Sequence, residues 1–136
     1  MIPYHDLVDK AIEARNAAYA PYSGFKVGAA LLTKDGRIFT GCNIENAAYS
    51  PTNCAERTAF FKAVSEGALG FAAIAVTGFR DGSQVKYTYP CGVCLQVMME
   101  FCDPSEMTVI AAKSSGDYRI STLAELLPKG FGPANL

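Results

Sequence analysis

Cys54-Ala55-Glu56 and, further along the chain, Pro90-Cys91-Gly92-Val93-Cys94 are the two stretches that decide how this sequence folds and what chemistry it carries. Together they supply three cysteines, with a glutamate two residues after the first of them. A structural zinc site usually closes its shell with four protein ligands, whereas a catalytic site keeps three and leaves one position open. Three cysteines beside one carboxylate therefore predict a catalytic zinc site, with Glu56 as its proton-transfer group.

Both stretches are expected to open helices. The apolar periodicity predicts one helix from about Asn53 to Glu66 and another from Pro90 or Cys91 to Phe101. A helix N-terminus carries a partial positive charge and free N–H groups, which lower the pKa of a cysteine and favour the thiolate. Because three thiolates leave a zinc site negatively charged, we expect Arg57 to offset part of that charge.

Two alternatives compete with this interpretation. Asn53 and Glu56 also fit a helix capping box, in which Glu56 would only bind backbone N–H groups. Cys42 and Cys102 are most simply small hydrophobic residues, but one of them could be a fourth ligand. A fourth sulfur would close the metal shell and make the protein a non-enzymatic zinc module.

Composition narrows the class of protein. At 136 residues the chain is expected to form a single domain over 1–136, with half of its residues hydrophobic and no apolar run long enough to span a membrane. The net charge is −1 and the basic residues are scattered, which argues against binding a nucleic-acid backbone and favours a small-molecule substrate. The first residues do not resemble a secretory signal, so the five cysteines indicate metal binding in a cytoplasmic protein rather than disulfides.

The rest of the pattern alternates strands with helices, which predicts a sheet between helical layers that is parallel after its first hairpin. A first helix is expected from His5 to Tyr19, ended by Pro21, and a last short one over Thr122–Leu127 with Glu125 in a capping box. The expected strands are Phe25–Thr33, Arg37–Gly41, Ala72–Thr77, Met107–Ala112 and Asp117–Ile120. The expected core includes Phe60, Phe61, Met98, Met99 and Phe101.

At these motifs the chain resembles the cytidine deaminase family in its short, zinc-dependent form. The resemblance covers nearly the whole chain and is carried by Ala20–Ser23, Phe25–Ala30, Gly41–Tyr49, Cys54–Ala59, Pro90–Cys94 and Glu125–Pro128. The cysteines also match the all-cysteine form of the zinc deaminase signature. The chain departs from the family at Leu95, where an arginine is common, so compensation of the thiolates would depend more on Arg57 and the helix N-termini.

The resemblance implies an α/β fold of three layers, α/β/α, with a mixed five-stranded sheet. It implies one Zn²⁺ per chain held by Cys54, Cys91 and Cys94, and Glu56 as the catalytic proton shuttle. It also implies substrate contacts: Asn43 and Glu45 with the ribose hydroxyls, Phe25 beside the nucleoside, the backbone around Ala55 at the pyrimidine edge, further contacts from Ala47 and Tyr49, and Phe131 over the base in a neighbouring subunit.

The activity that this resemblance implies is hydrolytic deamination of cytidine and deoxycytidine to uridine and deoxyuridine plus ammonia, a reaction of pyrimidine salvage. The implied assembly is a homotetramer with sites shared between subunits. The nearest alternative substrate is another aminated pyrimidine nucleoside, such as an antibiotic analogue. The charge balance and the short chain disfavour a deaminase that acts on polynucleotides.

Overall fold

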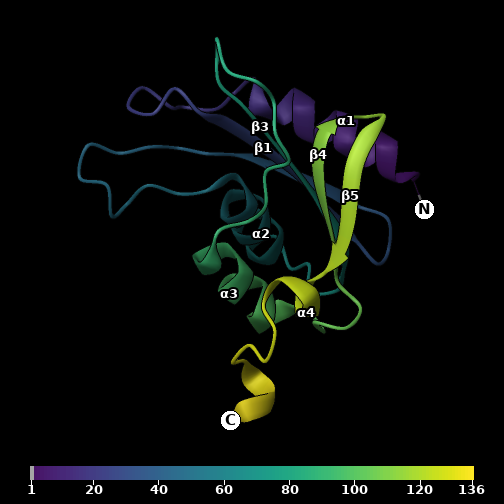
Figure 1. Ribbon diagram of the computed structural model, residues 1–136. Coiled ribbons are helices and arrows are strands. Elements are labelled where there is room, and N and C mark those ends of the chain that lie inside the picture. The colour runs from purple at the N-terminus through teal and green to yellow at the C-terminus, as the bar shows by residue number, and fades with distance from the viewer. Residues whose placement is uncertain (1) are drawn as a thin grey trace.

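The computed structural model describes residues 2–136, which are built around one five-stranded sheet (Figure 1). The strands span Lys26–Thr33 (β1), Ile38–Cys42 (β2), Phe71–Phe79 (β3), Thr108–Ser114 (β4) and Asp117–Thr122 (β5), and they lie in the order β2-β1-β3-β4-β5. The helices span Tyr4–Arg15 (α1), Ala55–Ser65 (α2), Gly92–Phe101 (α3) and Leu123–Leu126 (α4), and a 3-10 turn (η1) covers Pro133–Asn135.

The central strands are buried on both faces, and their side chains alternate between two cores. In β1, Ala29 and Leu31 belong to the core under α2 and α3, whereas Ala30 and Leu32 belong to the core under α1. Figure 1 shows α1 on one side of the sheet and α2, α3 and α4 on the other. The expected three-layer α/β/α architecture with a mixed sheet is therefore confirmed.

The strand directions correct one expectation. Only β3 and β4 run parallel, whereas β1 is antiparallel to both of its neighbours and β5 is antiparallel to β4. The sheet is therefore not parallel throughout after its first hairpin. The reason is that β2 returns to the sheet edge, so that β3 pairs with the other side of β1 and runs in the same direction as β2. Helical connections join β2 to β3 through α2 and β3 to β4 through α3, and a tight turn joins β4 to β5.

The first helix is shorter than the sequence pattern predicts, because it ends at Arg15 instead of Tyr19. Beyond Arg15 the chain unwinds, and Tyr19 pairs its backbone with the loop that follows β2: its N–H donates to Asn43 O at 3.0 Å, and its carbonyl accepts from Glu45 N at 2.9 Å. These long-range bonds compete with further helical bonds. They place the loop before β1 beside the loop after β2, where the site is built.

Most of the other local predictions hold. The capping box of α4 is formed between Thr122 and Glu125, as expected. Phe60 and Met98 are fully buried, but Phe61 is 48% exposed, so its assignment to the core is wrong. It neighbours Phe60 on α2 and so points to a different side of the helix. Across residues 2–136, none of the helices combines the length and the apolarity needed to cross a bilayer.

Candidate active site

Three sulfur atoms meet where α2 and α3 begin. Cys54 is the N-cap residue of α2, Cys91 is the N-cap residue of α3, and Cys94 lies in the first turn of α3. The Sγ atoms of Cys54 and Cys91 are 3.8 Å apart, those of Cys91 and Cys94 are 3.5 Å apart, and all three lie within 4.8 Å of one another. Zinc–sulfur bonds of about 2.3 Å in a tetrahedron place the sulfurs about 3.8 Å apart. The three cysteines fit one zinc ion, which confirms the predicted cofactor.

Arg57 accompanies this sulfur cluster. Its Nη2 lies 3.2 Å from the Sγ of Cys54, while its buried Nε has no hydrogen-bond partner within residues 2–136. Hydrogen bonding with Cys94, followed by the contact with Arg57, lowers the pKa of Cys54 to about 5, even though burial opposes the shift. The N-terminus of α2 thus favours the thiolate form of Cys54, and a cation is directed at its sulfur.

The other two cysteines stand apart from the cluster. Cys42 ends β2 and Cys102 follows α3, and neither belongs to the group of cysteines close enough to share a metal ion. Burial raises the pKa of Cys102 to about 12, so it behaves as an apolar residue. A fourth cysteine ligand is therefore ruled out within the part of the chain that the structure describes. Leu95 is 7% exposed and packs in the core under α2 and α3, so this position contributes no cation.

Glu56 lies in the first turn of α2 and is only 4% exposed. Burial raises the pKa of its carboxyl to about 7. The alternative capping box is not formed, because Cys54 rather than Asn53 is the N-cap residue, and the Asn53 amide instead donates to the Thr58 hydroxyl. A carboxyl that is close to half protonated at neutral pH is suited to accepting and returning a proton.

A cavity of about 330 Å³ opens beside these groups. Its lining includes Cys54, Cys91 and Glu56 together with four of the residues expected to contact substrate: Phe25, Asn43, Glu45 and Ala55. The other three do not line it. Ala47 and Tyr49 are exposed in the loop between β2 and α2, and Phe131 lies on the C-terminal tail.

Two glycines allow the backbone and Phe25 to approach closely. A Cβ at Gly41 would lie 2.4 Å from the carbonyl oxygen of Ala55, so glycine in β2 lets the start of α2 pack directly on the sheet. A Cβ at Gly78 would lie 2.4 Å from the ring of Phe25. This second glycine lets the ring lie against β3, where it forms a wall of the cavity.

The Asn43 amide is bonded to the strand beside the cavity. Its Oδ1 accepts from Val27 N at 2.9 Å, and its Nδ2 donates to Phe25 O at 2.8 Å. An amide nitrogen carries two hydrogens, so one donor remains for a ligand. Asn43 therefore holds the start of β1 in place and still has a donor available.

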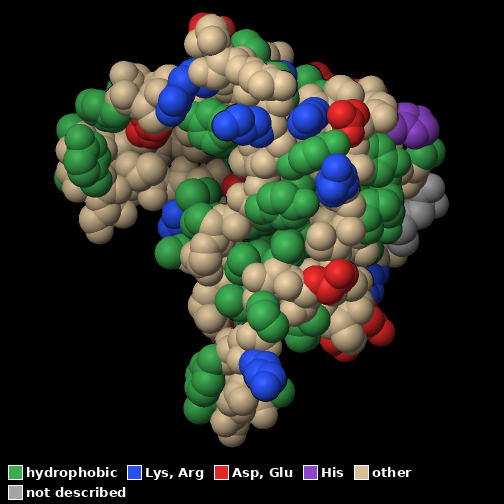
Figure 2. Space-filling model, in the orientation of Figure 1, with side chains coloured by type: hydrophobic (Ala, Val, Ile, Leu, Met, Phe, Trp, Pro, Cys, Tyr) green, Lys and Arg blue, Asp and Glu red, His purple; other side chains and the backbone are tan. Residues whose placement is uncertain are grey.

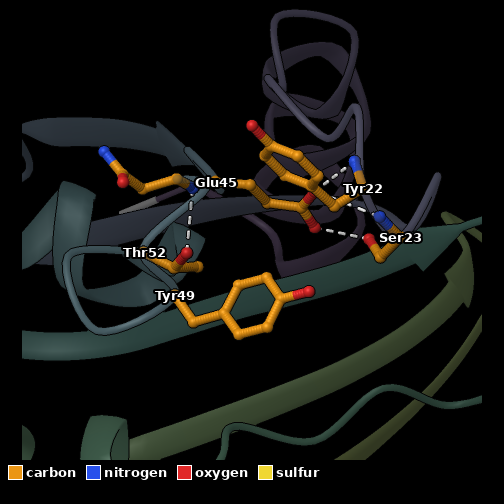
Figure 3. A pocket seen from close by; sticks show the side chains of 6 residues that line it. Tyr22, Ser23, Glu45, Tyr49 and Thr52 are labelled. Carbon is orange, nitrogen blue, oxygen red and sulfur yellow. Dashed lines mark hydrogen bonds between the residues drawn. The ribbon is translucent and has the colours of Figure 1, made fainter.

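Glu45 is held by the loop that precedes β1. Its carboxylate accepts from the backbone N–H groups of Tyr22 and Ser23 and from the Ser23 hydroxyl (Figure 3). Tyr22, Ser23 and Glu45 line an open hollow next to the cavity, together with Asn46, Tyr49 and Thr52. Tyr49 is 74% exposed there, with its ring edge-on to that of Tyr22.

Phe131 belongs to a tail that projects from the body of the molecule (Figures 1 and 2). The carbonyl oxygen of Phe131 accepts from Gln96 Nε2 at 2.8 Å, and Gly132 is buried close to Met99. The backbone of the tail is thus tied to α3, while the Phe131 side chain is 57% exposed. The Phe131 ring therefore does not line the cavity of its own chain.

The cavity also includes residues that the sequence patterns did not single out. Arg80, Thr88 and Tyr89 line it from the loop between β3 and α3. The guanidinium of Arg80 lies 5.8 Å from the centre of the Phe25 ring. Two features of the sequence could have identified these residues. Thr88 and Tyr89 directly precede Pro90 and the ligand Cys91. Arg80 follows the carboxyl end of a strand, where α/β sheets bind ligands.

Comparison with known proteins agrees with this geometry. Residues 1–111 match the family model for the cytidine and deoxycytidylate deaminase zinc-binding region. The chain is 52% identical over 130 residues to a cytidine deaminase of Sporosarcina psychrophila, covering 96% of this chain and 92% of that one. It is 51% identical over 125 residues to the cytidine deaminase of Halalkalibacterium halodurans, covering 92% and 91% of the two chains.

Solved structures show the same relationship. The crystal structure of cytidine deaminase from Burkholderia pseudomallei matches with a TM-score of 0.86 and 48% identity, covering 96% of this chain and all of that one. The enzyme from Mycobacterium tuberculosis matches with a TM-score of 0.81 and 37% identity, over 97% and 99% of the two chains. With three cysteines arranged for zinc beside a buried glutamate, the chain is a zinc enzyme that belongs to the cytidine deaminase family.

Proposed function

We propose that this enzyme deaminates cytidine and deoxycytidine by hydrolysis, releasing ammonia and forming uridine or deoxyuridine. One observation carries the proposal: the buried carboxyl of Glu56 shares a cavity with Cys54 and Cys91 of the three-cysteine cluster and with Phe25, Asn43 and Glu45. We infer further that residues 1–136 act as a single catalytic domain in cytoplasmic pyrimidine salvage.

Cys54, Cys91 and Cys94 would hold the zinc ion at the N-termini of α2 and α3. When bound, zinc supplies Lewis-acid chemistry that makes a nucleophile from water near neutral pH. Arg57 directs its positive charge at the Cys54 sulfur and so offsets part of the negative charge of the thiolates. The helix N-termini act in the same direction, because Cys54 and Cys91 are N-cap residues and the N-terminus of a helix carries a partial positive charge.

Glu56 is the group that moves protons. It takes one proton from the attacking water and delivers it to the pyrimidine ring nitrogen N3, and it then carries a second proton to the leaving amino group. Its pKa of about 7 allows both steps near neutral pH, since neither protonation state is strongly favoured. Its near-complete burial also keeps bulk water from competing for these protons.

The remaining residues orient the nucleoside. Phe25 offers an aromatic surface beside it, and the backbone around Ala55 meets the pyrimidine edge. Glu45 and the remaining amide hydrogen of Asn43 face the sugar as an acceptor and a donor. Ala47, Tyr49 and Phe131 lie outside the cavity of their own chain, and we infer that a homotetramer brings Phe131 over a neighbour's substrate.

The experiment that tests the activity is ammonia release from the purified, zinc-loaded protein with a panel of nucleosides. We expect turnover of cytidine and deoxycytidine and none of cytosine-containing oligonucleotides, because the chain lacks a clustered basic tract. Release of ammonia only from other aminated pyrimidine nucleosides would assign the site to an analogue deaminase instead.

A further inference from the structure

Ser23 joins two residues that face the nucleoside in the proposed function. Its hydroxyl donates to Glu45 Oε2 at 2.5 Å and accepts from the backbone N–H of Phe25 at 3.0 Å. Its own backbone N–H also donates to Glu45 Oε1 at 3.1 Å, and Tyr22 N donates to the same oxygen at 2.9 Å. Figure 3 shows the Glu45 carboxylate directed at this pair of residues. One serine is therefore bonded to the acceptor for the sugar and to the residue beside the base.

The loop that carries Ser23 is shaped for this contact. Gly24 has a φ of 68°, a backbone conformation that residues with a side chain rarely adopt. Its N–H donates to Ala20 O at 3.0 Å. This turn directs the N–H groups of Tyr22 and Ser23 toward Glu45. The backbone of Glu45 is restrained as well, because its N–H donates to Tyr19 O at 2.9 Å. Glu45 is thus held at its backbone and at both carboxylate oxygens by one loop.

These bonds determine from which directions the Glu45 carboxylate can accept a further hydrogen bond. Each carboxylate oxygen accepts more than one hydrogen bond, so the positions left on Glu45 are those not facing the loop. Ser23 and Glu45 both line the cavity that contains Glu56, which gives a ligand access to those positions. The Ser23 hydroxyl also lowers the pKa of Glu45 and so supports its ionised, acceptor-only form.

We propose that Ser23 is a positioning residue for recognition of the sugar: by orienting Glu45 and the start of β1 at Phe25, it sets the affinity for nucleosides that carry ribose hydroxyls. This inference rests on the proposed function. It assigns Ser23 no part in proton transfer, because its hydroxyl is used by Glu45 and Phe25.

The test compares Ser23→Ala with the zinc-loaded wild type. We expect the KM for cytidine to rise roughly 3- to 10-fold, the loss of one or two hydrogen bonds, while kcat stays unchanged. Ser23→Thr keeps the hydroxyl and should restore KM. Ser65→Ala is the matched control, since it removes an exposed hydroxyl that donates to Lys62 O at 2.8 Å at the far end of α2.

A substrate without the 2′- and 3′-hydroxyls separates positioning from a general structural role. With 2′,3′-dideoxycytidine, Ser23→Ala should lower kcat/KM much less than with cytidine, because Glu45 has no 2′- or 3′-hydroxyl to accept from and only the contact of Ser23 with Phe25 is lost. Glu45→Gln should likewise remove most of the effect of Ser23→Ala on cytidine. An equal loss for both substrates, or a fall in kcat at constant KM, would overturn the proposal.

The failure of this inference can be told apart from the failure of the proposed function. If the wild type releases ammonia from cytidine and Ser23→Ala behaves identically, only the role of Ser23 is wrong. If the wild type releases no ammonia from any pyrimidine nucleoside, the proposed function fails and the inference fails with it.

Discussion

The guanidinium of Arg57 lies 3.2 Å from the sulfur of Cys54, one helical turn along the start of α2. This pairing places a fixed positive charge beside a cluster of three cysteines that has no other arginine partner among residues 2–136. Leu95 is an uncharged residue buried in the core and cannot offset the negative charge of the thiolates. That charge is therefore offset by Arg57 and the two helix N-termini alone.

Removing this cation should weaken zinc binding. We expect Arg57→Gln to lower zinc affinity or activity about 10- to 100-fold, the usual effect of losing a group that orients a metal ligand. Arg57→Lys should retain more affinity, because it keeps the charge. Competition against a chromophoric chelator measures the change, and Arg37→Gln, a surface variant whose arginine pairs with Asp35, is the control. Equal zinc affinity in Arg57→Gln and the wild type would contradict the role of Arg57.

Glu56→Gln should keep zinc but lose turnover. The amide has nearly the same shape but cannot accept and return a proton, a function typically worth about 10²–10⁴-fold in rate. Measuring kcat together with the zinc content of the same preparation separates catalysis from metal binding. Glu66→Gln, at the exposed end of the same helix, should remain fully active. Wild-type turnover by Glu56→Gln would assign proton transfer to another group.

The cysteines should divide into two classes. Cys94→Ala should lose bound zinc and activity, because Cys94 is one of three sulfurs that lie within 4.8 Å of one another. Cys102→Ala should retain one zinc per chain, since Cys102 stands outside that group. Metal analysis by mass spectrometry gives the stoichiometry, and removal of zinc with a chelator should abolish the activity of the wild type. Loss of zinc from Cys102→Ala with its fold intact would restore the idea of a fourth ligand.

Gly41 should not tolerate a side chain. A Cβ there would lie 2.4 Å from the Ala55 carbonyl oxygen, a backbone atom that moves only with α2. We expect Gly41→Ala to destabilise the protein by about 1–3 kcal/mol and to weaken zinc binding through displacement of Cys54. Thermal or urea unfolding measures the first effect. Gly116→Ala, where a Cβ meets nothing within 4 Å, should unfold like the wild type.

Phe131 should act across a subunit boundary. Phe131→Ala is expected to weaken nucleoside binding roughly 5- to 100-fold, in line with stacking of a base on an aromatic ring. Subunits of Glu56→Gln co-assembled with subunits of Phe131→Ala should recover part of the activity, because some sites then combine an intact Glu56 with a neighbour's Phe131. Full activity of a monomer in analytical ultracentrifugation under assay conditions would rule out the shared site.

The amino-acid sequence by itself determined the local features of this protein. The spacing of Cys91 and Cys94 places both at the start of one helix, and Thr122 with Glu125 predicts the cap of α4. The zinc site could be predicted because its ligands belong to short motifs with a strong chemical preference. The helix starts and the cap depend on residues within one or two helical turns, so periodicity and residue type are enough to find them, whereas the pairing of Cys54 with Cys91, 37 positions away, was expected from the two motifs together.

Only the tertiary structure decided which distant segments meet. The antiparallel pairing of β3 with β1, the unwinding of α1 before Tyr19 and the place of Arg80 in the cavity all depend on strand order and loop closure. The bond of Ser23 to Glu45 joins residues 22 positions apart through two loops without regular structure. No periodic pattern encodes such contacts, because their partners are selected by the packing of the sheet that brings the two loops together.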